Sequence, residues 1–317
     1  MNKKNKRIAV AIPYYNAANH IVKVITDLPD FIDAVIIVND NSAEPLPYER
    51  IKKIGNVKTQ LVILENEINL GVGGATKKGF QYAIDHGFDI VVKVDADNQM
   101  DTSYLEKMLK PIINGKVKMS KGNRFRDLKS IENMPIVRRI GNLTLSFLTK
   151  AATGYWNNFD TTNGFIAIKV SLLKKIDFSN LSDNYFFETS LIAELYFTGA
   201  PIKDIAMPAI YGDEKSNMKI WKMPVIFLIN LIRVFFTRII KKYFLFDFNI
   251  GSLYILFGIP LFLFGVFFGL YEWWFYASQN IFAPTGTIMI VSLSIIIGFE
   301  LWLQAMQYDI FNAPKSK

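Results

Sequence analysis

The 317-residue sequence contains no cysteine and only two histidines. The lack of cysteine excludes disulfides, thiol nucleophiles and thiolate metal sites. Because His20 and His86 are the only imidazoles, a histidine-based metal cluster is not expected either.

The N-terminal region also lacks an apolar run long enough for a secretory signal. Four basic residues between positions 3 and 7 precede the apolar run 8–12, but Pro13 follows at once. A signal sequence needs about 7–15 apolar residues. We therefore interpret residues 8–12 as a first β-strand and expect the N-terminal half to be cytoplasmic.

The formal charge is +8, yet the sequence has no single dense tract of lysine and arginine. Some of the excess lies at the extreme N-terminus, and some flanks apolar segments near the C-terminus. This distribution favours an anionic membrane surface and phosphate-bearing substrates, and no nucleic acid partner is expected.

Up to about residue 213 the chain reads as a soluble domain in which β-branched runs alternate with helical stretches. Strands are predicted at 8–12, 34–38, 60–64, 90–94, 116–121, 164–168 and 202–208, and helices at 17–28, 73–86 and 187–198. Such alternation predicts an α/β fold with a doubly wound, mostly parallel sheet. Ligands bind such sheets at the carboxyl ends of the strands.

The C-terminal part carries two long apolar segments, 248–271 and 285–307. A membrane-spanning helix needs about 20 predominantly apolar residues, so both segments suffice and transmembrane helices are preferred over buried core helices. Trp273, Trp274 and Tyr276 are expected to form an interfacial belt between them. Glu300 lies inside the second segment, and whether it is functional is left open.

Lysine and arginine flank the two apolar segments on their outer sides, and the link between them has neither. The positive-inside rule then places both termini in the cytoplasm. Residues 224–246 are apolar but carry Arg233, Arg238, Lys241 and Lys242, which project within about half of a helical wheel. This pattern favours an amphipathic helix in the headgroup plane over a third span. We expect a domain at 1–217 and juxtamembrane helices at 218–247.

Asp95 and Asp97 follow the apolar strand predicted at 90–94, with Gln99 just beyond. Two carboxylates at a strand end can hold one hard cation such as Mg²⁺ or Mn²⁺, which would bridge to a diphosphate. The glycine-rich stretch 69–75 precedes a helix, where close backbone approach and phosphate binding are possible. Singly, each pattern is also compatible with an ordinary turn.

Further polar groups lie near other predicted elements. Asp40 and Arg124 follow strands, the loop 160–165 enters a strand, Glu188 lies at the start of the helix predicted at 187–198, and the stretch 213–216 lies in the loop after the last strand. Arginine suits fork-like recognition of phosphate. Each group on its own is as compatible with a structural role as with a functional one.

In order, these segments resemble the family 2 glycosyltransferases, in the branch with dolichyl-phosphate mannose synthase and bacterial polyprenyl-phosphate glycosyltransferases. The motifs are Ile-Pro-Tyr-Tyr-Asn at 12–16, Asn-Asp-Asn-Ser at 39–42, Asn69 to Gly79, Asp-Ala-Asp-Asn-Gln at 95–99, Gly122-Asn-Arg124, Asp160 to Phe165 and Tyr211 to Ser216. Together they cover roughly residues 7–220.

The resemblance implies a GT-A domain, inversion at the sugar, and roles for individual residues. It implies contacts to the nucleotide-sugar from Pro13, Tyr14, Asn16, Asp40, Asn69, Gly71, Gly74, Lys78, Asp95 and Ala96. It implies metal ligation by Asp95, Asp97 and Gln99, and an acceptor phosphate held by Arg124, Arg138, Asn142, Lys215 and Ser216. Asp97, Arg124, Arg138 and Glu188 are the residues implied for catalysis.

The implied reaction moves a hexose-type sugar from a UDP- or GDP-linked donor to a polyprenyl phosphate at the cytoplasmic face of the cell membrane. Three positions depart from the family pattern: Ala17 replaces a glutamate, Asn39 an aspartate, and Lys215 stands where relatives often have arginine. Two alternatives remain: a transferase acting on a hydroxyl acceptor, and a catalytically degenerate membrane adaptor. The sugar, the lipid and the oligomeric state are left open.

Overall fold

The computed structural model describes residues 5–54, 59–126, 136–208 and 223–315. The chain divides into two compact units. Unit 1 comprises residues 1–235 and 314–317, and unit 2 comprises residues 236–313.

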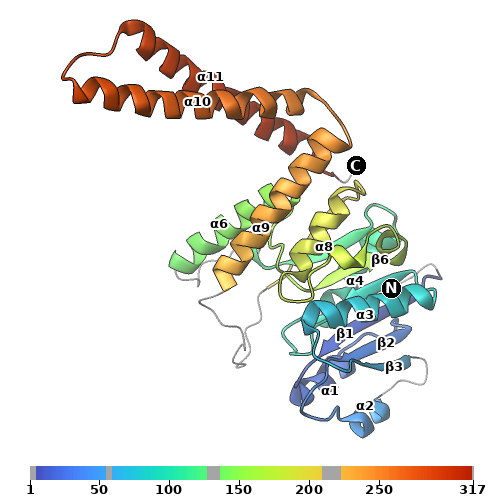
Figure 1. The fold of residues 1–317 in the computed structure, drawn as a ribbon. Coiled ribbons are helices and arrows are strands. Elements are labelled where there is room, and N and C mark those ends of the chain that lie inside the picture. Colours follow the sequence, from blue (N-terminus) through green and yellow to red (C-terminus); the bar gives the residue numbers. More distant parts are fainter. Residues whose placement is uncertain (1–4, 55–58, 127–135, 209–222, 316–317) are drawn as a thin grey trace. The chain divides into compact units, whose positions relative to one another are not determined.

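Seven strands in the described part of unit 1 form one sheet in the order β3-β2-β1-β4-β6-β5-β7 (Figure 1). The strands are β1 Ile8–Tyr14, β2 Ala34–Asn39, β3 Gln60–Glu65, β4 Ile90–Lys93, β5 Met119–Asn123, β6 Ile166–Lys169 and β7 Ile202–Ala206. Only β6 runs antiparallel to its neighbours β4 and β5. The predicted α/β fold with a mostly parallel sheet is therefore confirmed.

The strand register brings the polar motifs to one edge of the sheet. Tyr14 pairs with Asn39, and Asn39 pairs with Glu65, so the ends of β1, β2 and β3 are level. Lys93 at the end of β4 pairs with Ile166, the first residue of β6. Because β6 runs the other way, the chain that enters it lies at the same edge as the chain that leaves β4.

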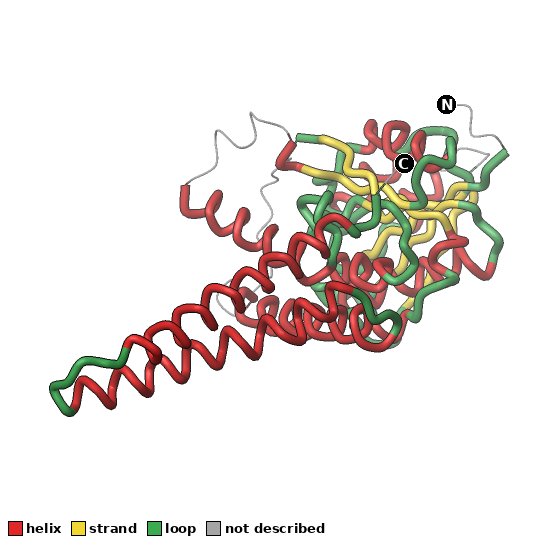
Figure 2. Tube along the Cα trace, turned by 90° about the horizontal axis from the view of Figure 1, so that it is seen from above, coloured by secondary structure: helices red, strands yellow, loops and turns green. Residues whose placement is uncertain are grey.

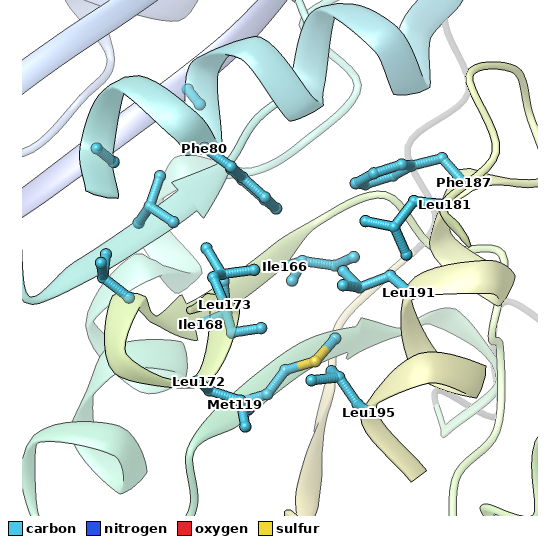
Figure 3. Packing of buried hydrophobic residues seen from close by; sticks show 14 of the residues in the cluster. Phe80, Met119, Ile166, Ile168, Leu172, Leu173, Leu181, Phe187, Leu191 and Leu195 are labelled. Atoms are coloured by element: carbon cyan, nitrogen blue, oxygen red, sulfur yellow. The ribbon is translucent and has the colours of Figure 1, made fainter. Parts of the chain in front are cut away.

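Alternating side chains of each strand pack against helices on the two faces of the sheet. Ile8, Val10 and Ile12 face α1 Ala18–Thr26, α2 Tyr48–Ile54 and α4 Leu105–Ile113. The smaller Ala9 and Ala11 face α3 Gly71–Asp85, with α7 Val170–Leu173 and α8 Phe187–Tyr196 on the same side (Figure 3). Three short 3₁₀ turns complete the unit: η1 Thr102–Tyr104, η2 Arg124–Arg126 and η3 Phe178–Asn180.

Among the described residues, four helices were not predicted from the sequence: α2, α4, the four-residue α7 and α6 Ile136–Thr153. Helix α4 contains Pro111, a residue that usually breaks a helix. Helix α6 does carry apolar residues at helical spacing, so this helix could have been predicted from its period. Arg138 therefore lies within a helix.

Unit 2 contains two long helices, α10 Ile250–Ser278 and α11 Thr285–Phe311, which run side by side (Figure 2). Both are long and apolar enough to cross a membrane, and few of their residues are buried. Gly258 and Gly265 face α11, where a Cβ would lie 2.8 Å from Leu301 and from Ile295 respectively. Helix α10 extends further than predicted, so Trp273 and Trp274 lie inside it and not in the link.

Helix α9 Met223–Ile240 continues into a π-helical turn, η4 Lys241–Leu245, ahead of α10. Arg238, one of the four basic residues that the sequence places on one side of this helix, does not face outward. Its guanidinium is buried and forms two bonds, of 2.7 and 3.0 Å, with the carboxylate of Asp309 in the last turns of α11. A distant partner of opposite charge overrides the helical-wheel pattern, because a buried arginine needs a counter-charge.

Candidate active site

A buried lysine joins two of the predicted site carboxylates. Lys93, the last residue of β4, is fully buried. Its Nζ atom lies 2.5 Å from Asp95 Oδ1 and 3.0 Å from Glu188 Oε1, at the start of α8. A Cβ on Gly164 would lie 2.6 Å from Lys93 Nζ and 2.8 Å from Asp95 Oδ2, so the chain passes close to this cluster at a glycine.

Burial and charge act in opposite directions on this cluster. Burial opposes the charged form of Lys93, but the charges of Asp95 and Glu188 outweigh it and raise the pKa of Lys93. Burial raises the pKa of Glu188, and the Asp95 charge adds to this, while the Lys93 charge counteracts both. The ammonium therefore makes it possible to keep two carboxylates close together at the sheet edge.

Asp97 lies two residues beyond Asp95, on the turn that leaves β4. Its Oδ1 accepts a 3.0 Å bond from the Gln99 backbone, and Asn98 between them adopts φ 59°, a left-handed conformation. Asp95, Asp97 and Gln99 are all partly exposed. All three side chains offer oxygen atoms, which is the ligand type that hard divalent cations prefer. No group of three acidic or imidazole side chains with metal-binding geometry occurs among the described residues.

Asp40 is buried where β2 ends and caps helix α3. Its carboxylate accepts bonds of 2.9 Å from the Leu70 N–H, 2.8 Å from the Gly71 N–H and 2.7 Å from the Asn66 side chain. An acidic group at a helix N-terminus is stabilised by the unpaired N–H groups there. This structural contact is separate from the implied contact of Asp40 to the nucleotide-sugar, which stays a prediction.

The glycines of α3 have a structural role in this fold, and their predicted contact to the nucleotide-sugar stays a prediction. The N–H groups of Gly73 and Gly74 donate to the carbonyl of Asp183, at 2.7 and 3.0 Å. A Cβ at Gly71 would lie 2.7 Å from the same carbonyl oxygen. Here the close approach is made by the segment before α8, and the N–H groups of Gly71, Gly73 and Gly74 are bonded within the protein. Lys78 likewise bonds the Glu65 carbonyl and the Asn66 side chain.

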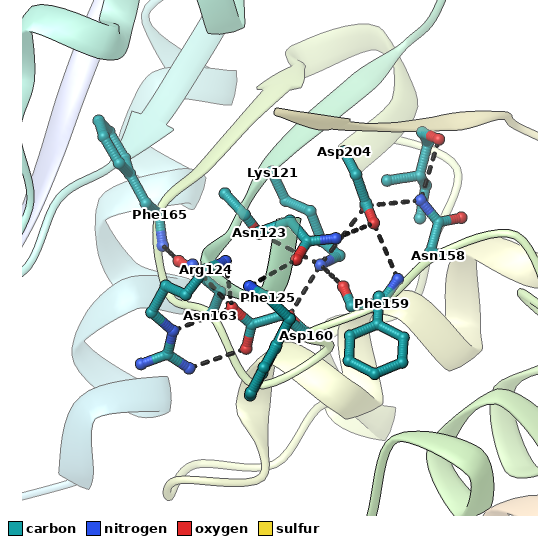
Figure 4. Close-up of polar contacts among 12 residues, drawn as sticks. Lys121, Asn123, Arg124, Phe125, Asn158, Phe159, Asp160, Asn163, Phe165 and Asp204 are labelled. Atoms are coloured by element: carbon teal, nitrogen blue, oxygen red, sulfur yellow. Dashed lines mark hydrogen bonds and ion pairs between the residues drawn. The ribbon is translucent and has the colours of Figure 1, made fainter. Parts of the chain in front are cut away.

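A second buried lysine organises the other half of the sheet edge (Figure 4). Lys121 in β5 donates to the carbonyls of Phe159 and Asp160 and lies 3.5 Å from Asp204. Burial lowers the pKa of Lys121, and the Asp204 charge opposes this. The lysine thereby fixes the loop before β6 against β5 and β7.

The same loop holds Arg124. Asp160 accepts bonds from Arg124 Nε at 2.9 Å and Nη2 at 2.8 Å, and from the Arg124 backbone at 3.0 Å. Burial opposes ionisation of Asp160, but these bonds hold its pKa below the usual range. Asp160 thus orients the guanidinium, while the side chain of Arg124 is still 41% exposed.

Some of the remaining predicted residues lie at the sheet edge, and others lie outside the described part of the chain. Pro13, Tyr14, Asn16 and Asn69 lie at the edge where the strand ends meet, and the Asn16 backbone donates to Ser42 Oγ. The side chains of Arg138 and Asn142, on α6, lie outside the described residues, as do Lys215 and Ser216 altogether.

Sequence reasoning missed Lys93, Lys121 and Asp204. A usable signal was present for Lys93, because it interrupts the apolar strand predicted at 90–94. A lysine is almost never fully buried unless it is paired. Lys121 gave no such signal, because the predicted strand 116–121 also contains Lys116 and Lys118. Glu188 and Asp204 come from distant segments, so the sequence could not have identified the two clusters.

Comparison with known proteins gives consistent matches. Residues 9–177 match the family model described as glycosyl transferase family 2. The chain is 34% identical to the UDP-N-acetylglucosamine–dolichyl-phosphate N-acetylglucosaminyltransferase of Methanococcus voltae, over 54% of this chain and 72% of that protein. It is 22% identical to the undecaprenyl-phosphate mannosyltransferase of Micrococcus luteus, over 67% of this chain and 88% of that protein.

Among solved structures, the chain resembles glucosyl-3-phosphoglycerate synthase from Mycobacterium tuberculosis in complex with Mn²⁺, UDP and glucosyl-3-phosphoglycerate. The TM-score is 0.54, the sequence identity is 15%, and the match covers 74% of this chain and 81% of that one. At this identity the likeness shows the fold alone.

Proposed function

Since the chain belongs to glycosyl transferase family 2, we propose that it moves a hexose-type sugar from a UDP- or GDP-linked donor to a polyprenyl phosphate. The transfer inverts the anomeric centre and takes place at the cytoplasmic face of the cell membrane. Two relatives support the acceptor, because their names specify dolichyl phosphate and undecaprenyl phosphate. The two apolar helices of unit 2 support a membrane location.

The observation that carries this proposal is the cluster of Lys93, Asp95 and Glu188 beside Asp97 at the sheet edge. Asp95, Asp97 and Gln99 would hold Mg²⁺ or Mn²⁺, which supplies positive charge for the departing nucleoside diphosphate. The Lys93 ammonium bonds Oδ1 of Asp95 and so holds this side chain in place. Asp95 can then present its other oxygen toward the metal position.

Arg124 would hold the acceptor phosphate, with Asp160 fixing the plane of the guanidinium. A bidentate arginine gives a phosphate both charge and direction. A lipid phosphate is already anionic at neutral pH, so the acceptor needs positioning and no strong base. This fits Glu188, whose carboxylate is paired with Lys93.

The test is a panel of UDP- and GDP-linked sugars offered with undecaprenyl phosphate and Mn²⁺ to the full chain in detergent, with the lipid analysed by mass spectrometry. We expect one sugar to add to the lipid phosphate through an alkali-labile linkage. Asp97→Asn is the matched control and should give no product. An alkali-stable glycoside would instead identify a hydroxyl acceptor. Absence of both binding and hydrolysis of every donor would favour a non-catalytic adaptor.

A further inference from the structure

Helix α6 presents its apolar side outward. Ile136, Ile140, Leu143 and Phe147 are 71%, 59%, 53% and 52% exposed. Their spacing of four, three and four residues places them in one stripe along the helix. A soluble protein normally turns such a stripe toward its core.

The opposite side of α6 is small and polar, yet it is the side that is buried. Thr149 and Thr153 are fully buried, and their hydroxyls bond to carbonyls of their own helix at 3.0 and 2.7 Å. Ala152 packs against Phe186 and Leu231. The helix is therefore inverted relative to a water-facing one, and the apolar stripe needs an apolar environment.

The charges of α6 point to an anionic partner. Its sequence contains Arg138, Arg139 and Lys150 and no acidic residue. Trp156 lies beside the stripe, with its ring 5.9 Å from that of Phe147. Apolar, basic and tryptophan side chains together are typical of helices that lie in the headgroup region of anionic membranes.

The apolar surface continues onto helix α9. Leu145 of α6 belongs to the same small core as Phe227 and Leu231 of α9, and Figure 1 shows the two helices side by side. Helix α9 exposes Val225 and Ile229 at 59% and 61% and also lacks acidic residues. It leads through η4 directly into α10 and α11, the two helices apolar enough to cross a membrane.

We propose that α6 is a membrane-docking helix, whose stripe Ile136, Ile140, Leu143 and Phe147 inserts into the headgroup–acyl boundary of an anionic bilayer. Unit 1 then has a membrane contact of its own, in addition to the helices of unit 2. If the proposed function holds, this contact also brings the α6 positions Arg138 and Asn142 to the depth of a lipid phosphate.

The absence of cysteine allows a direct test, because single cysteines can be labelled in the otherwise native full chain. Leu143→Cys and Phe147→Cys are labelled with an environment-sensitive fluorophore and reconstituted in vesicles of phosphatidylethanolamine and phosphatidylglycerol. Quenching is measured with lipids that carry a nitroxide near the top of the acyl chain, and with aqueous iodide. Gln81→Cys, exposed on α3, is the aqueous control, and Phe264→Cys, on α10, is the membrane control.

We expect the nitroxide lipid to quench both α6 labels at least about twofold, as for Phe264→Cys, with little quenching by iodide. The quenching should weaken when phosphatidylcholine replaces the anionic lipid. Iodide quenching equal to that of Gln81→Cys would overturn the proposal. So would a blue-shifted label that neither agent quenches, since it would show that protein, such as a second copy of the chain, covers the stripe. Melting temperatures equal to that of the unmodified chain establish that the labelled variants are folded, and the readout does not depend on transferase activity.

Discussion

Replacing Lys93 with methionine removes the ammonium between Asp95 and Glu188 while keeping an unbranched side chain. Lys93 is fully buried and Glu188 is only 6% exposed, so Glu188 loses its cation in a site that water does not reach. Removing one partner of a buried ion pair costs about 3 to 5 kcal/mol. For a unit of this size each kcal/mol lowers the melting temperature by about 2 to 4 °C, so a loss of roughly 6 to 20 °C is expected at pH 8.

The loss should depend on pH. Burial raises the pKa of Glu188, and the Lys93 charge lowers it, so in Lys93→Met the pKa of Glu188 rises further. A carboxyl whose pKa is higher in the folded than in the unfolded state stabilises the fold fully at low pH. That stabilisation is lost as pH rises through the folded pKa. The deficit in melting temperature should therefore be smaller at pH 5 than at pH 8.

The assay is thermal unfolding of the detergent-solubilised full chain at a fixed heating rate, with hydrogen exchange of peptides from β1 and β4 assigning the loss to unit 1. The control combines Lys93→Met with Glu188→Gln, which removes the carboxylate that has lost its cation. This double variant should recover at least half of the deficit in melting temperature at pH 8. A single variant as stable as the original chain at pH 8, or a deficit of the same size at both pH values, would refute the reasoning.

Four further outcomes are expected. Asp97→Asn should lower sugar transfer more than about 100-fold without changing membrane insertion, and unchanged turnover would mean that this carboxylate is misassigned. Asp160→Asn should cost about 1.5 to 3 kcal/mol at pH 7. Because the pKa of Asp160 is lowered, the difference in stability between the variant and the original chain should narrow as pH falls below about 4. A difference that stays constant as pH falls would contradict this prediction. Gly73→Ala should cost about 1 to 3 kcal/mol, since its Cβ would meet the Asp183 carbonyl at 2.9 Å. Gly141→Ala, with nothing within 4 Å, should cost nothing, and equal melting temperatures for the two would show that the close packing is misread. Chelation of divalent ions should abolish transfer, with recovery on adding Mn²⁺ or Mg²⁺, and transfer that persists in chelator would argue against a metal.

The local sequence pattern was enough to predict the class of fold and the position of several motifs at strand ends. Alternating β-branched and helical runs predicted a mostly parallel sheet, and the structure confirms it with the ends of β1, β2 and β3 level at one edge. The motifs at Asp40 and Asp95 could be placed at strand ends because strand polarity alone puts them there. The two apolar helices could be predicted because length and apolarity are local properties.

What the tertiary structure decided is which groups meet across long stretches of chain. Lys93 forms an ion pair with Glu188, and Arg238 forms one with Asp309. The backbone of Gly73 bonds the carbonyl of Asp183. In each case the partner comes from a distant segment of the chain. The sequence also could not predict which side of α6 is buried. A helical period shows that the two sides of a helix differ, but not which side the rest of the protein covers. Burial and pairing energies depend on the neighbours in space, and these neighbours exist only once the chain has folded.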